Sequence, residues 1–231
     1  MSTKRILVLW DVDRTLLATD GGSWRALFDA GCSIFGESFT LDGLDMWGRP
    51  DSAIWREVAR ANGLSDAGAE EDRFRAAYLD SLKEQQASRS TIRSLPGARE
   101  LVERLAEQDQ VTQAILSGNY PEIGRLKVER AGLDLGCFTV CAWGSDGTER
   151  RDLVPVALAR YREHTGRPIE PGQVIIIGDT PRDVDCARAY GCRCLAVATG
   201  RSSLEALEET GADLVLADLT DTERVLGWIC G

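Results

Sequence analysis

Residues 5–17 read RILVLWDVDRTLL, and this stretch decides the fold that we expect. Ile6 to Trp10 form an apolar run typical of a buried strand, and Asp11 and Asp13 follow it directly. Because side chains alternate along extended backbone, residues two positions apart point to the same side, so the two carboxylates repel each other. The sequence therefore predicts that a positive group offsets their charge at the end of the strand.

Apolar segments like the first recur along the chain and alternate with helical patterns. Ala98, Leu101, Val102 and Leu105, for example, have the i, i+3, i+4, i+7 spacing of one helix face. Continuous apolar strands separated by helices are typical of a parallel sheet covered on both faces. We therefore expect a Rossmann-like α/β core. The predicted strands cover residues 5–10, 111–116, 138–142, 174–177, 192–198 and 213–216.

The stretch between the first two strands has a different character. Residues 18–95 carry helical apolar stripes, such as Phe74, Ala77, Tyr78 and Leu82, and contain no convincing strand. This stretch is too long to be a loop inside a compact domain. We expect a small helical domain over residues 18–95, inserted into a core made of residues 1–17 and 96–231.

Composition limits the classes of partner. The 231 residues carry a net charge of −10, without a basic stripe that could neutralise the phosphates of duplex nucleic acid. No stretch approaches the ~20 apolar residues of a membrane helix. The apolar run after the basic start MSTKR is too short for a signal peptide. We expect a cytoplasmic monomer or weak homodimer with no nucleic-acid or membrane partner, and the odd count of seven cysteines indicates reduced thiols.

The residues that follow each apolar run are the candidates for a functional site, because ligands of an open parallel sheet bind beyond the carboxyl ends of its strands. Acidic, hydroxyl, amide and basic groups stand at these places. They are Asp11, Asp13, Ser117, Gly118, Asn119, Arg150, Arg151, Asp179 and Asp183. Groups of these kinds are what phosphoryl transfer needs, so their agreement favours that chemistry.

Four short segments, in order, resemble the motifs of the haloacid dehalogenase (HAD) superfamily. They are DVDRT (11–15), the serine of ILSGN (115–119), the basic part of ERRD (149–152) and GDTPRD (178–183). The helical insert resembles the cap domain of that superfamily. WGRPD (47–51) resembles a G-x-T-D segment in the caps of phosphoglycolate-phosphatase-like members, with proline where threonine is usual.

The resemblance implies an aspartyl-phosphate mechanism that uses Mg²⁺. Asp11 is expected to attack phosphorus, and Asp13 to protonate the leaving alcohol and then accept a proton from the attacking water. A cation must screen the charge between carboxylate and phosphate, and Mg²⁺ suits a site with few carboxylates. The expected ligands are Asp11, Asp179 and the backbone carbonyl of Asp13. Asp183 also completes a capping box with Thr180, and we expect it to bind the metal or orient its waters.

The hydroxyl of Ser117 is expected to donate to a phosphoryl oxygen, with help from backbone N–H groups around Gly118. The segment SGNYPE is also ordinary turn and N-cap chemistry, so Asn119 suits substrate contact and capping equally. In the cap, Arg49 lies in a Gly-Arg-Pro turn and is the residue that we expect to face the substrate.

The cation of the third motif is commonly a lysine in the superfamily, and this chain has Arg150 and Arg151 instead. Asp152 is expected to cap a helix beginning at Leu153, which places both arginines before its positive end. A cation is unfavourable there unless an anion lies nearby. The spacing to Leu153 favours Arg150 as the catalytic residue, and Arg151 stays a rival.

A phosphatase for a small phosphorylated metabolite, such as phosphoglycolate or a sugar phosphate, is the favoured interpretation. A metal-free dehalogenase would not need the acid at Asp13. A phosphonate hydrolase needs a lysine in the cap that forms a Schiff base, for which only Lys83 is available, and the related sugar phosphomutases use a cap histidine, whereas His164 lies in the core. A catalytically retired binding protein would have lost a key acid, and none is lost.

Two features leave the substrate open. Arg14 stands where the superfamily has glycine, in a tight loop that favours glycine for its backbone freedom. Its side chain is either idle or directed toward the substrate. Trp24 and Trp47 are candidate substrate contacts, but tryptophans at helical spacing belong more often to the core.

Overall fold

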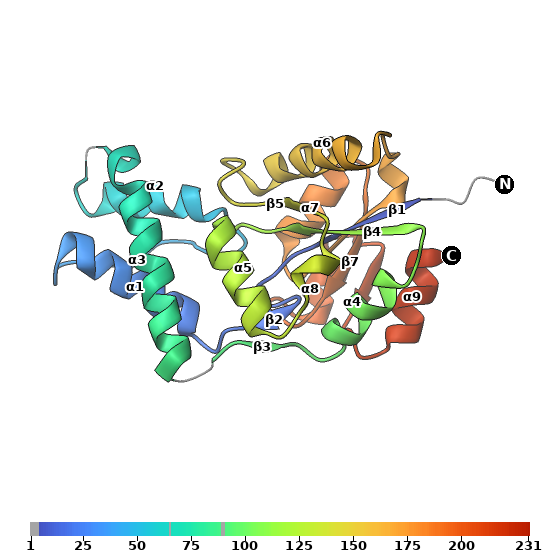
Figure 1. Ribbon diagram of the computed structural model, residues 1–231, viewed down its shortest axis with the longest axis horizontal. Coiled ribbons are helices and arrows are strands. Elements are labelled where there is room, and N and C mark those ends of the chain that lie inside the picture. Colours follow the sequence, from blue (N-terminus) through green and yellow to red (C-terminus); the bar gives the residue numbers. More distant parts are fainter. Residues whose placement is uncertain (1–4, 65, 89–90) are drawn as a thin grey trace.

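A six-stranded parallel sheet forms the centre of the computed structural model, which describes residues 5–64, 66–88 and 91–231 (Figure 1). The strand order is β5-β4-β1-β6-β7-β8, and every neighbouring pair is parallel. The strands are β1 (Ile6–Trp10), β4 (Val111–Leu116), β5 (Val140–Ala142), β6 (Val174–Gly178), β7 (Arg193–Val197) and β8 (Leu214–Leu216). The predicted α/β fold is confirmed, and the predicted ends of these strands differ from the observed ones by at most two residues.

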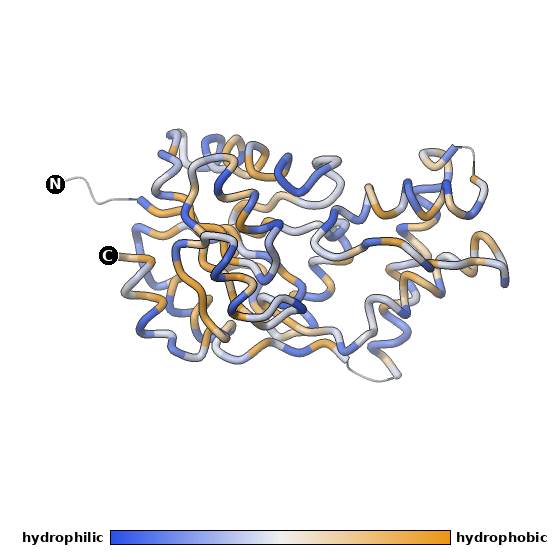
Figure 2. The backbone as a smooth tube through the Cα atoms, turned by 180° about the vertical axis from the view of Figure 1, so that it is seen from behind, coloured by the Kyte–Doolittle hydropathy of each residue, from blue (hydrophilic) through white to orange (hydrophobic). Residues whose placement is uncertain are grey.

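Helices cover both faces of this sheet, which explains why its strands are apolar throughout. Val8 and Trp10 of β1 pack on one face with α4, α5 and α9, while Leu7 and Leu9 pack on the other face with α6, α7 and α8. The apolar segments consequently gather at the centre of this part of the molecule (Figure 2). The covering helices are α4 (Ala98–Ala106), α5 (Pro121–Arg130), α6 (Leu153–Thr165), α7 (Pro181–Ala189), α8 (Leu204–Glu208) and α9 (Thr222–Cys230).

Three further helices lie together beyond the carboxyl end of β1, at the left of Figure 1. They are α1 (Gly22–Phe35), α2 (Asp51–Ala61) and α3 (Ala67–Ser88), and α3 packs against the other two. Their shared core contains buried aromatic residues such as Trp55, Phe74 and Tyr78. This group, called the helical segment below, places its side chains directly opposite the ends of the central strands.

The chain enters and leaves the helical segment through a short antiparallel ribbon. Strand β2 (Leu17–Ala18) pairs with β3 (Arg93–Ser94). The expectation that residues 18–95 contain no strand was therefore wrong at these two places. Strands of two residues are too short to show alternation in the sequence, and this ribbon exists because the outgoing and returning connections run side by side.

No helix among the described residues is both long enough and apolar enough to cross a membrane.

Candidate active site

The residues that follow β1, β4 and β6 converge on one pocket. Asp11, Ser117 and Asp179 all line this pocket, whose volume is about 950 Å³ including the solvent at its mouth. The helical segment forms its opposite wall. Residues that are more than 100 positions apart in the sequence therefore meet, as the carboxyl ends of neighbouring parallel strands must.

Three buried carboxylates form an acidic centre, of which Asp11 and Asp179 line the pocket and Asp183 is fully buried beside them. Oxygens of Asp11, Asp179 and Asp183 lie within 4.8 Å of one another. Gly178 permits this crowding, because a Cβ atom at that position would lie 2.1 Å from Cγ of Asp183. Burial raises the pKa of Asp11 to about 7 and that of Asp179 to about 9, and repulsion among the three acids adds to the effect.

Arg150 supplies the positive group that the first strand requires. Its Nη2 lies 2.6 Å from Oδ1 of Asp11, and its Nε donates to Oδ1 of Asp183 at 2.8 Å. Burial alone would lower the pKa of Arg150, but the two carboxylates outweigh it and hold that pKa well above its usual value. One guanidinium cannot neutralise three carboxylates, and the raised pKa values of Asp11 and Asp179 mean that the metal-free centre holds protons near neutral pH.

The local backbone determines which arginine enters the site. Arg150 to Asp152 form a short 3₁₀ turn, η2, before α6. Asp152 stands at the N-cap position of α6, which begins at Leu153 as expected, but its side chain makes no capping bond to α6. It accepts instead from the N–H groups of Thr148 and Glu149. The turn buries Arg150 beside Asp11 and leaves Arg151 exposed, at 2.8 Å from Asp185.

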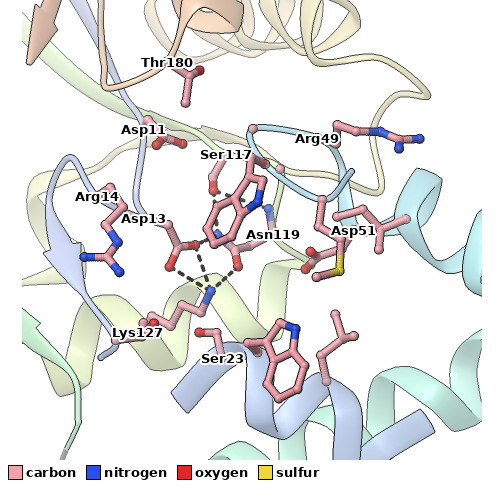
Figure 3. Close-up of a pocket in the computed structure, with 18 of the residues that line it drawn as sticks. Asp11, Asp13, Arg14, Ser23, Arg49, Asp51, Ser117, Asn119, Lys127 and Thr180 are labelled. Atoms are coloured by element: carbon pink, nitrogen blue, oxygen red, sulfur yellow. Dashed lines mark hydrogen bonds and ion pairs between the residues drawn. The ribbon is translucent and has the colours of Figure 1, made fainter. Parts of the chain in front are cut away.

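A second charged group lies beside the acidic centre (Figure 3). Lys127 of α5 donates to both carboxylate oxygens of Asp13, at 3.0 and 2.8 Å, and to Oδ1 of Asn119 at 2.6 Å. Nδ2 of Asn119 donates to Asp13 at 2.7 Å and to the Ser117 hydroxyl at 2.8 Å. The network therefore ties the Asp13 carboxylate to Lys127 and to Asn119, which also contacts the Ser117 hydroxyl.

Sequence reasoning missed Lys127 as a member of the site. Its side chain is only 3% exposed. Burial alone would lower its pKa, but the Asp13 carboxylate more than offsets this and the pKa lies above its usual value. A signal was present, because Lys127 stands four residues after Ile123 on the buried face of α5, where an apolar residue is the norm.

The donor chemistry of the acidic centre suits a hard divalent cation. Carboxylate oxygens from three residues face one another, and Mg²⁺ is bound by oxygen ligands. Asp183 also forms the capping box of α7 with Thr180, as the sequence indicated. The side chain of Asp13 is directed to Lys127, so only its backbone carbonyl is left for the role that the resemblance implied.

The helical segment touches the site through the start of α2. Asp51 donates its N–H to the Gly118 carbonyl at 2.6 Å, and its carboxylate accepts from the N–H of Tyr120 at 2.8 Å. Gly118 is needed for this approach, because a Cβ there would lie 2.3 Å from the Arg49 carbonyl oxygen. Burial raises the pKa of Asp51 to about 7, and Lys127 opposes that rise.

Arg49 and Arg14 both border the pocket. The guanidinium of Arg49 donates to Glu57 at 2.6 Å and points away from the Asp13 network in Figure 3. Arg14 has a φ of 67°, the left-handed region that favours glycine, which agrees with the superfamily's use of glycine at this place. Trp24 and Trp47, for which the sequence left substrate contact and core packing open, line the pocket and are partly exposed, so they do not belong to the core.

Comparison with known families gives the assignment. Residues 8–188 match the family of haloacid dehalogenase-like hydrolases. The chain belongs to this family. The resemblance seen in the four motifs is confirmed, and so is the expectation of a hydrolase. The matched range contains both the strand-end residues of the pocket and the helical segment.

Individual relatives of this HAD-family chain are distant. A phosphoglycolate phosphatase from Pseudomonas putida is 25% identical over 226 residues, covering 92% of this chain and 76% of its own. Phosphoglycolate phosphatase 1 from Pseudomonas aeruginosa is also 25% identical, covering 93% of this chain and 77% of its own.

Solved structures share the fold at lower identity. A hydrolase from Pseudomonas syringae has a TM-score of 0.71 at 21% identity, with 99% of this chain and 100% of that chain covered. CbbY from Rhodobacter sphaeroides, solved in complex with phosphate, has a TM-score of 0.72 at 19% identity, with 93% and 95% covered. These similarities place the sheet and the helical segment together in one known architecture.

Proposed function

We propose that this HAD-family hydrolase is a Mg²⁺-dependent phosphatase that acts on a small organic phosphate monoester through an aspartyl-phosphate on Asp11. The observation that carries the proposal is the buried group of three carboxylates, opposed by one guanidinium and adjacent to the Ser117 hydroxyl. The phosphoglycolate phosphatases among its relatives support the reaction class.

In this proposal each residue has one task. The Asp11 carboxylate attacks phosphorus, which divides hydrolysis into two easier displacements. Arg150, 2.6 Å from Asp11, holds that carboxylate in place and stabilises the charge of the phosphoryl oxygens. Ser117 and the backbone N–H groups around Gly118 and Asn119 donate to the same oxygens.

Asp13 is the general acid and base of the proposal. Lys127 and Asn119 hold its carboxylate two residues beyond the nucleophile, where the departing alcohol leaves and the water later enters. Arg151, which pairs with Asp185 outside the acidic centre, has no part in the reaction.

Asp11, Asp179 and the backbone carbonyl of Asp13 would hold the Mg²⁺ ion, with Asp183 as a further ligand or as an anchor for its waters. When bound, the ion supplies positive charge that screens the approach of a carboxylate to a phosphate. Three carboxylates with only Arg150 as their ion-pair partner among the described residues favour such an ion, which replaces the protons that they otherwise hold.

We also propose that residues 18–95 form a cap domain over a core of 1–17 and 96–231. The two connections meet in the β2–β3 ribbon, and α1 to α3 pack mainly with one another. A cap of this kind excludes water from the site and contacts the alcohol part of the substrate. Cytoplasmic location and the monomer or weak homodimer stay predictions of the sequence.

The direct test is phosphate release from p-nitrophenyl phosphate by the purified protein. We expect turnover with Mg²⁺, loss of turnover in excess EDTA, and recovery when Mg²⁺ is restored. No turnover with any divalent ion, over a range of small phosphate esters, would contradict the proposed function.

Magnesium is expected to raise the melting temperature more at pH 8 than at pH 5.5. The pKa values of Asp11 and Asp179 in the folded protein lie above their ordinary 3.8, so the folded state binds more protons than the unfolded state from about pH 4 upward. Stability of the metal-free protein therefore falls as pH rises through this window.

At pH 8 a divalent ion replaces those protons, and Mg²⁺ at a hundred times its Kd should raise Tm by about 5–10 °C. Differential scanning fluorimetry with EDTA or MgCl₂ measures the shift, and Asp179→Asn should remove most of it. Equal shifts at both pH values, or an unchanged shift in the variant, would contradict this prediction.

Arg150→Met is expected to lower kcat by ~10²-fold or more, because the variant removes the cation beside the nucleophile. Arg151→Met, the matched change on the neighbouring residue, should stay within about twofold of wild type, since that side chain is exposed and faces Asp185. Steady-state kinetics of both variants with p-nitrophenyl phosphate shows which arginine is the catalytic cation. A large loss in Arg151→Met and a small one in Arg150→Met would reverse the assignment.

A further inference from the structure

The wall that the helical segment gives to the pocket is mainly apolar. It combines side chains from all three helices and from the loop before α2. They are Trp24 and Leu27 of α1, Met46 and Trp47 of the loop, Ile54 of α2 and Tyr78 of α3. Trp24 and Trp47 are 48% and 43% exposed, and they are the large apolar side chains that the described residues leave open to solvent. Open aromatic surface inside a catalytic pocket indicates contact with a ligand.

One face of the Trp24 ring packs against Phe28. The two rings are stacked, with centroids 5.4 Å apart and planes 11° from parallel. Phe28 belongs to a continuous series of aromatic contacts that crosses the helical segment and returns to the pocket. The series is Trp24, Phe28, Phe39, Phe35, Trp55, Phe74 and Tyr78. One face of the indole is therefore supported, and a substrate would meet a surface that needs little ordering.

Trp47 is fixed at the mouth of the pocket by contacts with the core. The guanidinium of Arg201 lies 3.5 Å from the centroid of its ring, and Nε of Arg182 donates to its carbonyl at 3.1 Å. Arg182 also pairs with Asp45 at 2.7 Å. The two tryptophans therefore bound the space outside the catalytic residues with fixed aromatic rings.

The charges on this wall do not suit an ionised alcohol group. Arg49 is its cation, and its Nη1 donates to Glu57 and to the Asp45 carbonyl at 2.6 and 2.7 Å. The carboxylate of Asp51 already accepts from the N–H of Tyr120. An acidic substituent would face apolar rings and Asp51 without a free cation on the wall, and burying such a charge unpaired is costly.

The other cations of the pocket lie on the core side. Lys127 uses all three of its N–H donors on Asp13 and Asn119, and Arg150 is bound to Asp11 and Asp183. Arg14 lines the same pocket and makes no ion pair with any residue in the described ranges. It follows Asp13 in the chain, so the free cation of the pocket lies on the core side, opposite the wall of the helical segment.

From this arrangement we infer that the alcohol part of the substrate carries an aromatic or similarly flat apolar group, which stacks on Trp24. The inference rests on the proposed phosphatase function and adds the substrate class. Trp24 is then a specificity-determining residue, with Trp47, Leu27 and Ile54 closing around the same group.

Three phosphate esters of primary alcohols test the inference, because their leaving groups differ little in reactivity. They are 2-phenylethyl phosphate, ethyl phosphate and phosphoglycolate, each assayed with the Mg²⁺-loaded full-length protein. We expect kcat/KM for 2-phenylethyl phosphate to exceed the other two values by at least about tenfold, because the phenyl group leaves water on binding.

Variants of Trp24 distinguish the loss of stacking on the substrate from a loss of activity toward all substrates. Trp24→Ala should lower kcat/KM for 2-phenylethyl phosphate about tenfold, mainly through KM, and change that for ethyl phosphate less than twofold. Trp24→Phe keeps a flat ring and should retain most of the preference. Arg56→Ala, a change of an exposed side chain elsewhere on α2, serves as the control and should leave both values unaltered.

The outcomes distinguish failure of the proposed phosphatase function from failure of the inferred substrate class. Absence of turnover with all three esters and with p-nitrophenyl phosphate would remove the proposed function itself. Turnover with equal or higher kcat/KM for ethyl phosphate or phosphoglycolate would overturn only the substrate class. A Trp24→Ala variant that loses activity equally on 2-phenylethyl and ethyl phosphate would also overturn it.

Discussion

Replacement of Asp11 by asparagine is expected to lower kcat for p-nitrophenyl phosphate by at least ~10⁴-fold while the protein stays folded. The amide cannot attack phosphorus to form an acyl phosphate, so the chemical step loses its nucleophile rather than part of its stabilisation. Stopped and continuous assays with Mg²⁺ measure the loss, and a residual activity above about 1% of wild type would contradict the role of Asp11.

The fold should survive because Asp11 is one member of a crowded acidic group. Asparagine retains an oxygen that can accept from Arg150, and Arg150 keeps its bond to Asp183. Removing one of three neighbouring negative charges also relieves repulsion at neutral pH. Circular dichroism and a melting temperature within a few degrees of wild type would establish that the loss is chemical.

A matched change elsewhere gives the control. Asp185→Asn alters an exposed aspartate of α7, two residues after Asp183, whose one ion-pair partner among the described residues is Arg151. Its activity should stay within twofold of wild type. Rapid quenching followed by peptide mass spectrometry adds an independent measurement, because a phosphoryl group should appear on the Asp11 peptide of wild type and be absent in Asp11→Asn.

The core of the fold could be predicted because its signals are local. A buried parallel strand is a run of apolar residues, and the ends of β1, β4 and β6 are marked by the change to polar residues. Parallel strands then bring these ends together whatever the loops between them do. The meeting of Asp11, Ser117 and Asp179 in one pocket follows from topology alone.

Other features depend on how segments that are distant in the sequence pack together, and such packing has no local signal in the sequence. The ribbon of β2 and β3 exists only because two connections run in parallel. Trp24 has the spacing of a core residue, but α1 turns it toward the pocket instead of the helical core. Arg150 and Arg151 could be separated only once the 3₁₀ turn fixed which side chain points inward.

Lys127 is the clearest example of a contact that the sequence does not predict, because its partner Asp13 lies 114 positions away. We expect Asp13→Ala to destabilise the protein by ~2 kcal/mol and to lower kcat by ~10²–10⁴-fold. The Lys127 side chain is 3% exposed, so the variant leaves a buried ammonium that is bound only to Asn119. The Asp13 side chain is 38% exposed, which keeps the expected loss below that of a fully buried pair.

A double-mutant cycle isolates this pair. Lys127→Met keeps the length of the side chain and should cost less than Asp13→Ala, because the partly exposed Asp13 carboxylate remains in contact with water. The double variant Asp13→Ala/Lys127→Met contains neither charge. We therefore expect its loss in free energy of unfolding to be ~1–2 kcal/mol smaller than the sum of the losses in the two single variants. Urea denaturation of the metal-free proteins at pH 7 measures the coupling, and losses that add within ~0.5 kcal/mol would show that the pair contributes nothing.

Asp13→Asn then separates chemistry from stability. The asparagine oxygen can still accept from Lys127, so most of the stability lost in Asp13→Ala should return while kcat stays low, because the amide transfers no proton. Lys127→Met should lower kcat by about tenfold or more with little change in KM, since its loss frees the Asp13 carboxylate from one of the two groups that hold it. A Lys127→Met enzyme with wild-type kcat would mean that Asn119 alone positions the acid, and the lysine would then serve only the stability of the fold.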